Sequence, residues 1–175
     1  MQALRRLAGG IDALVDAAGR LVAWVMLALV LLMSANVLLR YLFSIGSVAA
    51  QELEWHLMSP IVLVGMAYAL LHDGHLRVAL IYAKLPTRAR LAVNLIASLI
   101  GVVFSGLVIW LGWKYVLQSY AIDEGSPDPG GLPHRFILKA FIPLGFALLL
   151  LYSIAEAIHA WLALVAGDDR FRAAR

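Results

Sequence analysis

Four apolar segments dominate this chain, at residues 21–39, 53–71, 91–113 and 141–166. About 20 apolar residues in a helix cover the roughly 30 Å hydrocarbon core of a bilayer. Inside a membrane the backbone polar groups must be satisfied within each segment, which requires helices here. The sequence therefore predicts an all-α integral membrane protein, with the 175 residues forming a single domain, a bundle of four transmembrane helices.

Composition excludes several functional classes. Hydrophobic residues make up 63% of the chain and charged residues 14%, so little is left outside the spans for a catalytic domain. There is no cysteine, which excludes thiolate catalysis and cysteine-ligated metal centres. No phosphate-binding loop, zinc-protease motif or nucleophile elbow is present, and no basic run indicates nucleic acid. We expect a non-enzymatic membrane protein without nucleic-acid partners.

The basic residues predict the topology. Ten of the fourteen lie in the N-terminal segment, the second loop and the C-terminal tail, which share one side if both termini do. Because cytoplasmic segments are enriched in lysine and arginine, both termini are expected in the cytoplasm. In a bacterium, the protein would be a multi-pass protein of the inner membrane, with its first and third loops in the periplasm.

The residues before the first span alternate in polarity at helical spacing. Leu4, Leu7, Ile11 and Leu14 recur on one face, with charged residues on the others. This pattern predicts an amphipathic helix lying in the cytoplasmic interface. The alternative is that these residues are the first turns of one long, tilted helix.

Small residues form a stripe on the third span. Ala97, Gly101 and Ser105 recur every four residues, a spacing that lets another helix approach closely. The stripe predicts a helix–helix contact, either within this bundle or with a partner protein.

Glu156 and two histidines raise questions of chemistry. Glu156 lies in the fourth span, where a carboxylate is costly and serves either a proton pathway or an ion pair at the membrane boundary. His72 and His159 lie near the cytoplasmic ends of two spans, where a pair of imidazoles is able to ligate a haem iron. A haem-bearing membrane anchor is therefore an alternative function, and an autonomous small transporter is another.

Several short motifs occur in a fixed order along nearly the whole chain. They are Asn36-Val37-Leu38-Leu39-Arg40-Tyr41, Glu52-Leu53, Gly65 with Ala67, Gly74-His75-Leu76-Arg77-Val78, residues 125–133 (GSPDPGGLP) and residues 142–146 (IPLGF). In this order, and with four spans, the chain resembles the small membrane subunits of tripartite ATP-independent periplasmic (TRAP) transporters, the DctQ-like family. Many relatives carry two acids where this chain has Gln51-Glu52, and an Asp where it has Ala79.

The resemblance implies a non-catalytic subunit of a three-part uptake system for organic acids. A periplasmic binding protein captures the substrate and a large membrane subunit moves it, usually driven by a sodium gradient. The small subunit is expected to bind no cofactor, to brace the large subunit and to help dock the binding protein. The third loop, rich in Gly and Pro, is either such a docking surface or a plain connection.

Two structural roles are expected for polar residues at the membrane boundaries. Arg40, at the outer end of the first span, is predicted to pair with Glu52 or Glu54 at the start of the second. Gly74 is predicted to end the second helix. His75 and Arg77 would then anchor to lipid headgroups or to the cytoplasmic edge of the large subunit.

Overall fold

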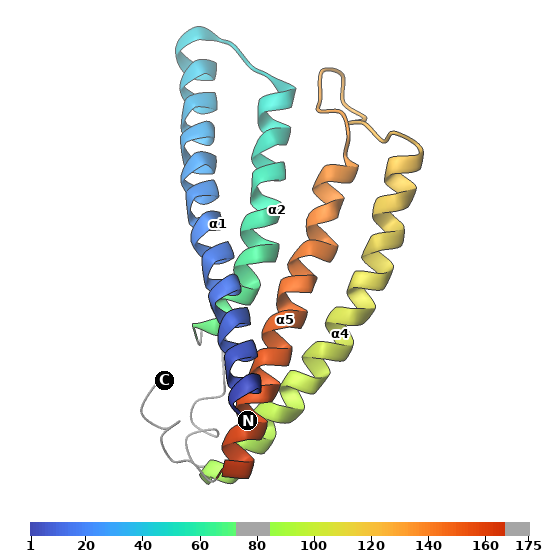
Figure 1. The fold of residues 1–175 in the computed structure, drawn as a ribbon. Coiled ribbons are helices and arrows are strands. Elements are labelled where there is room, and N and C mark those ends of the chain that lie inside the picture. Colours follow the sequence, from blue (N-terminus) through green and yellow to red (C-terminus); the bar gives the residue numbers. More distant parts are fainter. Residues whose placement is uncertain (73–84, 167–175) are drawn as a thin grey trace.

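The computed structural model describes residues 1–72 and 85–166, and they form four long helices joined by loops (Figure 1). The helices are α1 (Gln2–Phe43), α2 (Val48–Leu71), α4 (Thr87–Ala121) and α5 (Phe136–Ala166). All four are long and apolar enough to cross a membrane, and the described part of the chain contains no strand. The predicted all-α fold with four membrane-spanning helices is confirmed. The helices extend beyond the apolar segments at most of their ends.

The helices pack in the order α1, α2, α5, α4, with α4 contacting mainly α5 (Figure 1). The N-terminus of α1 and the C-terminus of α5 lie at the same end of the structure, here called the terminal end. The α1–α2 and α4–α5 connections lie together at the opposite end, here called the loop end. The α1–α2 pair and the α4–α5 pair diverge toward the loop end, where α4–α5 loop residues reach α2.

The prediction of a separate interfacial helix at the N-terminus is wrong. Helix α1 runs without a break for 42 residues, about 63 Å at 1.5 Å per residue, so the first residues are the early turns of one long helix. Ala8 and Val15 on these turns are fully buried. Gly19 lies so close to α2 that an added Cβ would be 2.0 Å from Tyr68 Cδ2. Packing against the bundle at Val15 and Gly19 holds this segment in place.

The small hydrophobic core lies in the half of the molecule near the terminal end. It consists of Val15 from α1, Ala67 from α2, and Leu149 and Tyr152 from α5. The Tyr152 hydroxyl donates a 3.0 Å hydrogen bond to the Leu70 carbonyl in the last turn of α2, which ties α5 to the end of α2. Most large apolar side chains face outward, as expected where lipid or a membrane partner surrounds the helices.

The small-residue stripe of α4 packs within this chain at two of its three positions. A Cβ on Gly101 would lie 2.6 Å from Ser153 Oγ on α5, and Ser105 is fully buried. Ala97, one turn closer to the terminal end, remains exposed. Gly101 and Ser105 thus make the helix contact within this bundle, which was one of the two predicted alternatives. Ala97 does not take part in that contact.

Helices α2 and α5 approach each other closely at Gly145. A Cβ there would lie 2.6 Å from Leu63 Cβ and 2.7 Å from its carbonyl oxygen. Because part of the obstacle is backbone, side-chain rotation alone cannot relieve the clash. Gly145 therefore sets the distance between these two helices.

Gly145→Ala is expected to lower the stability of the helix pair by about 1–3 kcal/mol, as overpacking does in well-packed cores. Gly106→Ala on α4 is the matched control, since no atom lies within 4 Å of its added Cβ. Thermal unfolding of both variants in detergent checks this: Gly145→Ala should melt earlier and Gly106→Ala should not. Equal melting temperatures would contradict the close approach.

Candidate functional site

The most structured polar site lies at the loop end, around the first turns of α2. Helix α2 begins after Ser47, whose side chain accepts a 3.3 Å hydrogen bond from the Ala50 N–H as an N-cap. This start places Glu52 beside the α4–α5 loop (residues 122–135). Its side chain is only 13% exposed.

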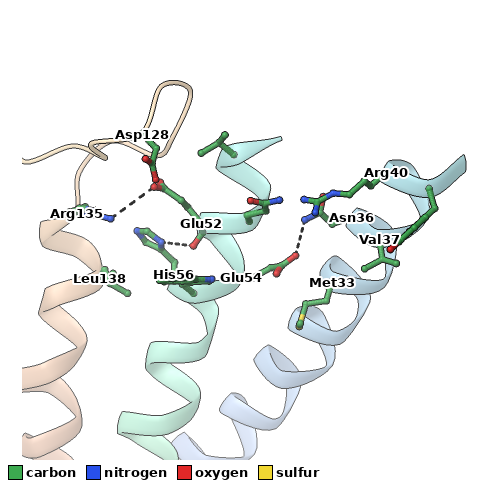
Figure 2. A pocket seen from close by; sticks show the side chains of 14 residues that line it. Met33, Asn36, Val37, Arg40, Glu52, Glu54, His56, Asp128, Arg135 and Leu138 are labelled. Atoms are coloured by element: carbon green, nitrogen blue, oxygen red, sulfur yellow. Dashed lines mark hydrogen bonds and ion pairs between the residues drawn. The ribbon is translucent and has the colours of Figure 1, made fainter. Parts of the chain in front are cut away.

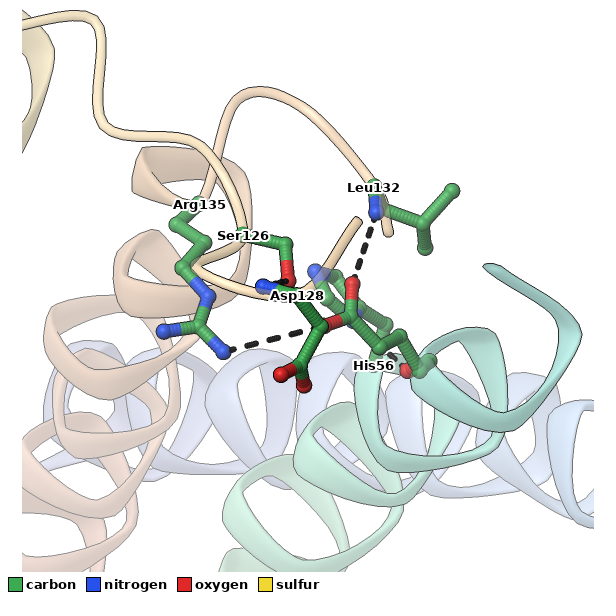
Figure 3. Close-up of polar contacts among 6 residues, drawn as sticks. His56, Ser126, Asp128, Leu132 and Arg135 are labelled. Atoms are coloured by element: carbon green, nitrogen blue, oxygen red, sulfur yellow. Dashed lines mark hydrogen bonds and ion pairs between the residues drawn. The ribbon is translucent and has the colours of Figure 1, made fainter. Parts of the chain in front are cut away.

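Glu52 holds the α4–α5 loop through both carboxylate oxygens (Figure 3). The Ser126 hydroxyl donates to Oε1, and the Leu132 N–H donates to Oε2 over 2.7 Å. Arg135 Nη2 lies 4.0 Å from Oε1. Such hydrogen bonds to a charged acceptor are stronger than neutral ones. One side chain of α2 thus joins residues that lie 74 to 83 positions later in the chain.

The loop also holds its own shape. Ser126 N–H donates to the Leu132 carbonyl over 3.0 Å, and Gly131 N–H to the Asp128 carbonyl over 3.0 Å. A Cβ on Gly131 would lie 2.4 Å from Ser126 Oγ and 2.8 Å from Glu52 Oε2, so only glycine fits beside the carboxylate. Residues 127–130 remain exposed at the tip. The result is a fixed loop with an exposed tip.

A groove of about 500 Å³ runs over the outer face of α2, beside the contacts between Glu52 and the α4–α5 loop (Figure 2). Its floor is the first turns of α2, and its walls come from α1 on one side and from α5 and the loop on the other. The lining residues are Met33, Asn36, Val37, Arg40, Tyr41, Val48, Gln51, Glu52, Glu54, Trp55, His56, Asp128, Arg135 and Leu138.

The predicted pairing of Arg40 with Glu52 or Glu54 is not found among the ion pairs of the described residues. Glu52 is held by the α4–α5 loop, and Glu54 accepts a 3.0 Å hydrogen bond from Asn36 Nδ2 (Figure 2). Arg40 is exposed and lines the groove instead. The prediction placed Arg40, Glu52 and Glu54 close together, and all three line the groove. The predicted ion pair is wrong because Ser126 and Leu132 donate to Glu52 and Asn36 donates to Glu54.

The two histidines of the haem alternative lie at the terminal end and contact carboxylates on α1. His159 Nε2 is 2.9 Å from Asp12 Oδ2, and His72 Nε2 is 3.5 Å from Asp16 Oδ1. His72 Nδ1 is also 3.2 Å from the Tyr68 carbonyl. These contacts tie the first turns of α1 to α5 and α2. The geometry gives a bis-histidine iron site no support.

Glu156 is half-buried and lines a second cavity, of about 250 Å³, between α2, α4 and α5. Asn94, Ala97, Gly101 and Ser153 line the same cavity. Ala97 and Gly101 of the small-residue stripe therefore lie beside the acid. This cavity is near the terminal end and is separate from the groove over α2.

Three expected site residues, Gly74, His75 and Arg77, lie outside the described residues, so their predicted roles remain predictions. Within residues 1–72 and 85–166, no group of three or more His, Cys, Asp or Glu side chains could hold a metal ion.

Sequence reasoning missed most partners of the loop-end site. Ser126, Leu132 and Arg135 bind Glu52, although nothing in their spacing relates them to it. A signal was present, because Glu52 and the loop segment 125–133 both belong to the ordered motifs. What was lacking was the information that these two motifs touch.

Glu52→Ala is expected to release the α4–α5 loop. The substitution leaves the half-buried Leu132 N–H without its acceptor and removes the charged acceptor of the Ser126 hydroxyl, so the bound state of the loop is destabilised. Hydrogen exchange of residues 124–134 should accelerate roughly tenfold or more, while α4 and α5 keep their protection. Glu54→Ala is the control, since Glu54 contacts α1 and not the loop. Equal hydrogen-exchange rates of the loop in the two variants would show that Glu52 does not hold the loop.

Loop order is also expected to depend on pH through Glu124. Its hydrogen bond from Lys139, with the nearby charges of Lys139 and Arg135, lowers the pKa of Glu124 below its usual value of 4.5. The stabilisation is therefore complete above about pH 4.5 and is lost as the pH falls through the lowered pKa. Hydrogen exchange of the loop, corrected for intrinsic rates, should show this step. Glu124→Gln should reduce the step, and an unchanged step would exclude Glu124 as its cause.

Comparison with known proteins identifies the family. The model of the DctQ component of tripartite ATP-independent periplasmic transporters matches residues 29–163. The ectoine TRAP transporter small permease protein TeaB of Halomonas elongata is 32% identical over 143 residues, 79% of this chain and 71% of TeaB. The C4-dicarboxylate TRAP transporter small permease protein DctQ of Vibrio cholerae is 31% identical over 151 residues, 74% of this chain and 64% of that protein.

A third relative is the uncharacterized protein y4mM of Sinorhizobium fredii. It is 31% identical over 133 residues, which are 75% of this chain but only 23% of that protein. The family match and the four apolar helices agree along the same stretch of sequence. The chain is therefore a multi-pass membrane protein and belongs to the DctQ family, the small permease subunits of TRAP transporters.

Proposed function

We propose that this chain braces the large membrane subunit of a TRAP transporter and helps dock a periplasmic substrate-binding protein. The observation that carries the proposal is the α4–α5 loop, which Glu52 fixes to α2 with its tip exposed. A fixed loop loses little conformational entropy on binding, which favours its use as a docking surface. The outward apolar faces of α1 and α4 supply surface for a membrane partner.

The charge distribution supports placing the terminal end in the cytoplasm. Among the described residues, that end carries Arg5, Arg6, Arg20, Arg88 and Arg90. The loop end carries fewer basic residues and has Glu52, Glu54, Asp123, Glu124 and Asp128 beside them. By the positive-inside rule, the loop end then faces the periplasm of a bacterial inner membrane, where a binding protein meets it.

Substrate recognition and energy coupling are assigned to the other subunits. The relatives are named for different substrates, ectoine in one and C4-dicarboxylates in the other, although both belong to the same family of small subunits. We assign organic acid uptake to the complete system, with a sodium gradient used by the large subunit. The chain itself is proposed to bind no cofactor and to catalyse no reaction.

Reconstitution in proteoliposomes tests this function. With a sodium gradient and labelled C4-dicarboxylates or ectoine as probes, the chain alone should give no uptake. Uptake should require the large membrane subunit and the binding protein from the same organism, and omission of this chain should abolish it. Uptake by the chain alone would support the autonomous transporter instead, and a Soret band after haem-replete expression would support the haem-bearing anchor.

A further inference from the structure

The N-terminal half of α1 has an apolar face that the other described helices leave exposed. A different face of this half packs on the bundle through Ala8, Val15, Gly19 and Val22, which are buried. Each of three leucines directly precedes one of these buried residues, so the leucines lie about a quarter turn around the helix from the packed face. They belong to a row of exposed residues, here called the α1 seam, that consists of Ala3, Leu7, Gly10, Leu14, Ala17 and Leu21.

The α1 seam has the spacing of a helix face that packs against another helix. Its residues are separated alternately by four and three positions, a mean spacing of about 3.5 residues. An apolar repeat of this length keeps one face turned toward a partner helix over several turns. Lipid tails have no repeat of their own and select no such spacing. Leucine also alternates with alanine or glycine along the seam, which leaves gaps for the side chains of a partner helix.

Gly10 lies at one of these gaps. Glycine inside a helix is unfavourable relative to alanine, because it loses more backbone freedom on folding. A Cβ added to Gly10 would meet no atom within 4 Å, so packing against the described residues does not require the missing side chain. Gly10 lies between Leu7 and Leu14, one turn from each on the same face. The open space over Gly10 therefore fits a side chain that comes from another protein.

Charged residues place this half of α1 outside the hydrocarbon core. Residues 21–39 contain none, whereas residues 5–20 contain Arg5, Arg6, Asp12, Asp16 and Arg20. A charged side chain in hydrocarbon is costly, so lipid tails surround the first of these stretches and not the second. Helix α1 continues between the two without a break and contacts His159 of α5 through Asp12, so its first turns do not lie flat on the membrane surface (Figure 1). A protein, rather than lipid, is therefore suited to cover the α1 seam.

Two arginines flank the α1 seam on the side away from the bundle. Arg6 and Arg20 are exposed, and each lies two residues before a buried residue, which is nearly the opposite side of a helix. Arg20 pairs with Asp16 on its own helix, and Arg6 makes no ion pair among the described residues. A partner helix with an acidic residue beside its apolar positions would complement this flank, whereas a second copy of this chain would present the same two arginines.

We infer that the α1 seam docks a helix of the large membrane subunit that carries apolar residues at the same repeat and an acidic residue beside Arg6. This inference rests on the proposed function, because it names the surface by which the chain braces the large subunit. The contact lies at the terminal end, which the proposed function places in the cytoplasm. Outside the lipid tails, burial of the seam leucines removes apolar surface from water and so favours the contact.

Binding of the full chain to the large membrane subunit in detergent, measured as a dissociation constant, tests the α1 seam. Gly10→Leu fills the gap in the seam and should weaken binding about tenfold or more, and Arg6→Glu should do the same by reversing the complementary charge. Gly9→Leu and Arg5→Glu are the matched controls, because they make the same changes one position away and off the seam. A Cβ on Gly9 also meets no atom within 4 Å. Each variant of the free chain should melt at the same temperature as its control, which separates a lost contact from lost stability.

Cross-linking identifies what covers the α1 seam. The chain has no cysteine, so a cysteine introduced at one position carries a single photoreactive benzophenone after labelling. Labelled Leu14→Cys should cross-link to the large subunit within the assembled transporter, and labelled Gly9→Cys should not. A cross-link from Leu14→Cys to a second copy of this chain or to phospholipid, in place of the large subunit, would overturn the inference.

The outcomes also separate this inference from the proposed function. If the wild-type chain does not bind the large subunit, the bracing function itself is wrong. If the wild-type chain binds, and Gly10→Leu and Arg6→Glu bind as tightly as their controls, only the assignment of the α1 seam is wrong.

Discussion

The carboxylate of Glu52 is the contact on which the loop end of this protein depends. Toward this end the two helix pairs diverge, and the α4–α5 loop reaches back to α2 through Ser126, Leu132 and Arg135. The same carboxylate stands beside His56, whose ring is oriented by the Glu52 carbonyl. One residue thus positions the exposed loop tip and one edge of the groove, so that both surfaces have a fixed relation to the helices.

The two ends of the molecule are held by different chemistry. At the terminal end, Asp12 and Asp16 of α1 face His159 of α5 and His72 of α2 over a small apolar core. At the loop end, hydrogen bonds within a short loop and from that loop to Glu52 hold the structure. Between the ends, Gly145 lets α2 and α5 approach through the middle of the bundle. The terminal end therefore supplies the scaffold, and the loop end supplies the polar surfaces.

The exposed apolar surface also has a physical explanation in this arrangement. Four helices packed in the order α1, α2, α5, α4, with α4 contacting mainly α5, leave much of each helix uncovered. Within a bilayer, lipid or another membrane subunit covers such surface without cost. Small-residue contacts such as Gly101 with Ser153 provide the close helix packing that the hydrophobic effect does not drive in lipid. Helices packed in this way leave apolar surface that is suited to contact a larger membrane protein.

Sequence by itself determined the four helices and the family, because apolar length and motif order are local properties. It also located polar residues such as Arg40, Glu52 and Glu54 at one boundary. Only the tertiary structure decided their partners: Glu52 meets a loop more than 70 residues away, and Glu54 meets Asn36. The first turns of α1 likewise join the bundle because Val15 and Gly19 fit against it, which amphipathic spacing alone does not reveal. Long-range contacts depend on how whole helices pack, and that information is not contained in any short segment.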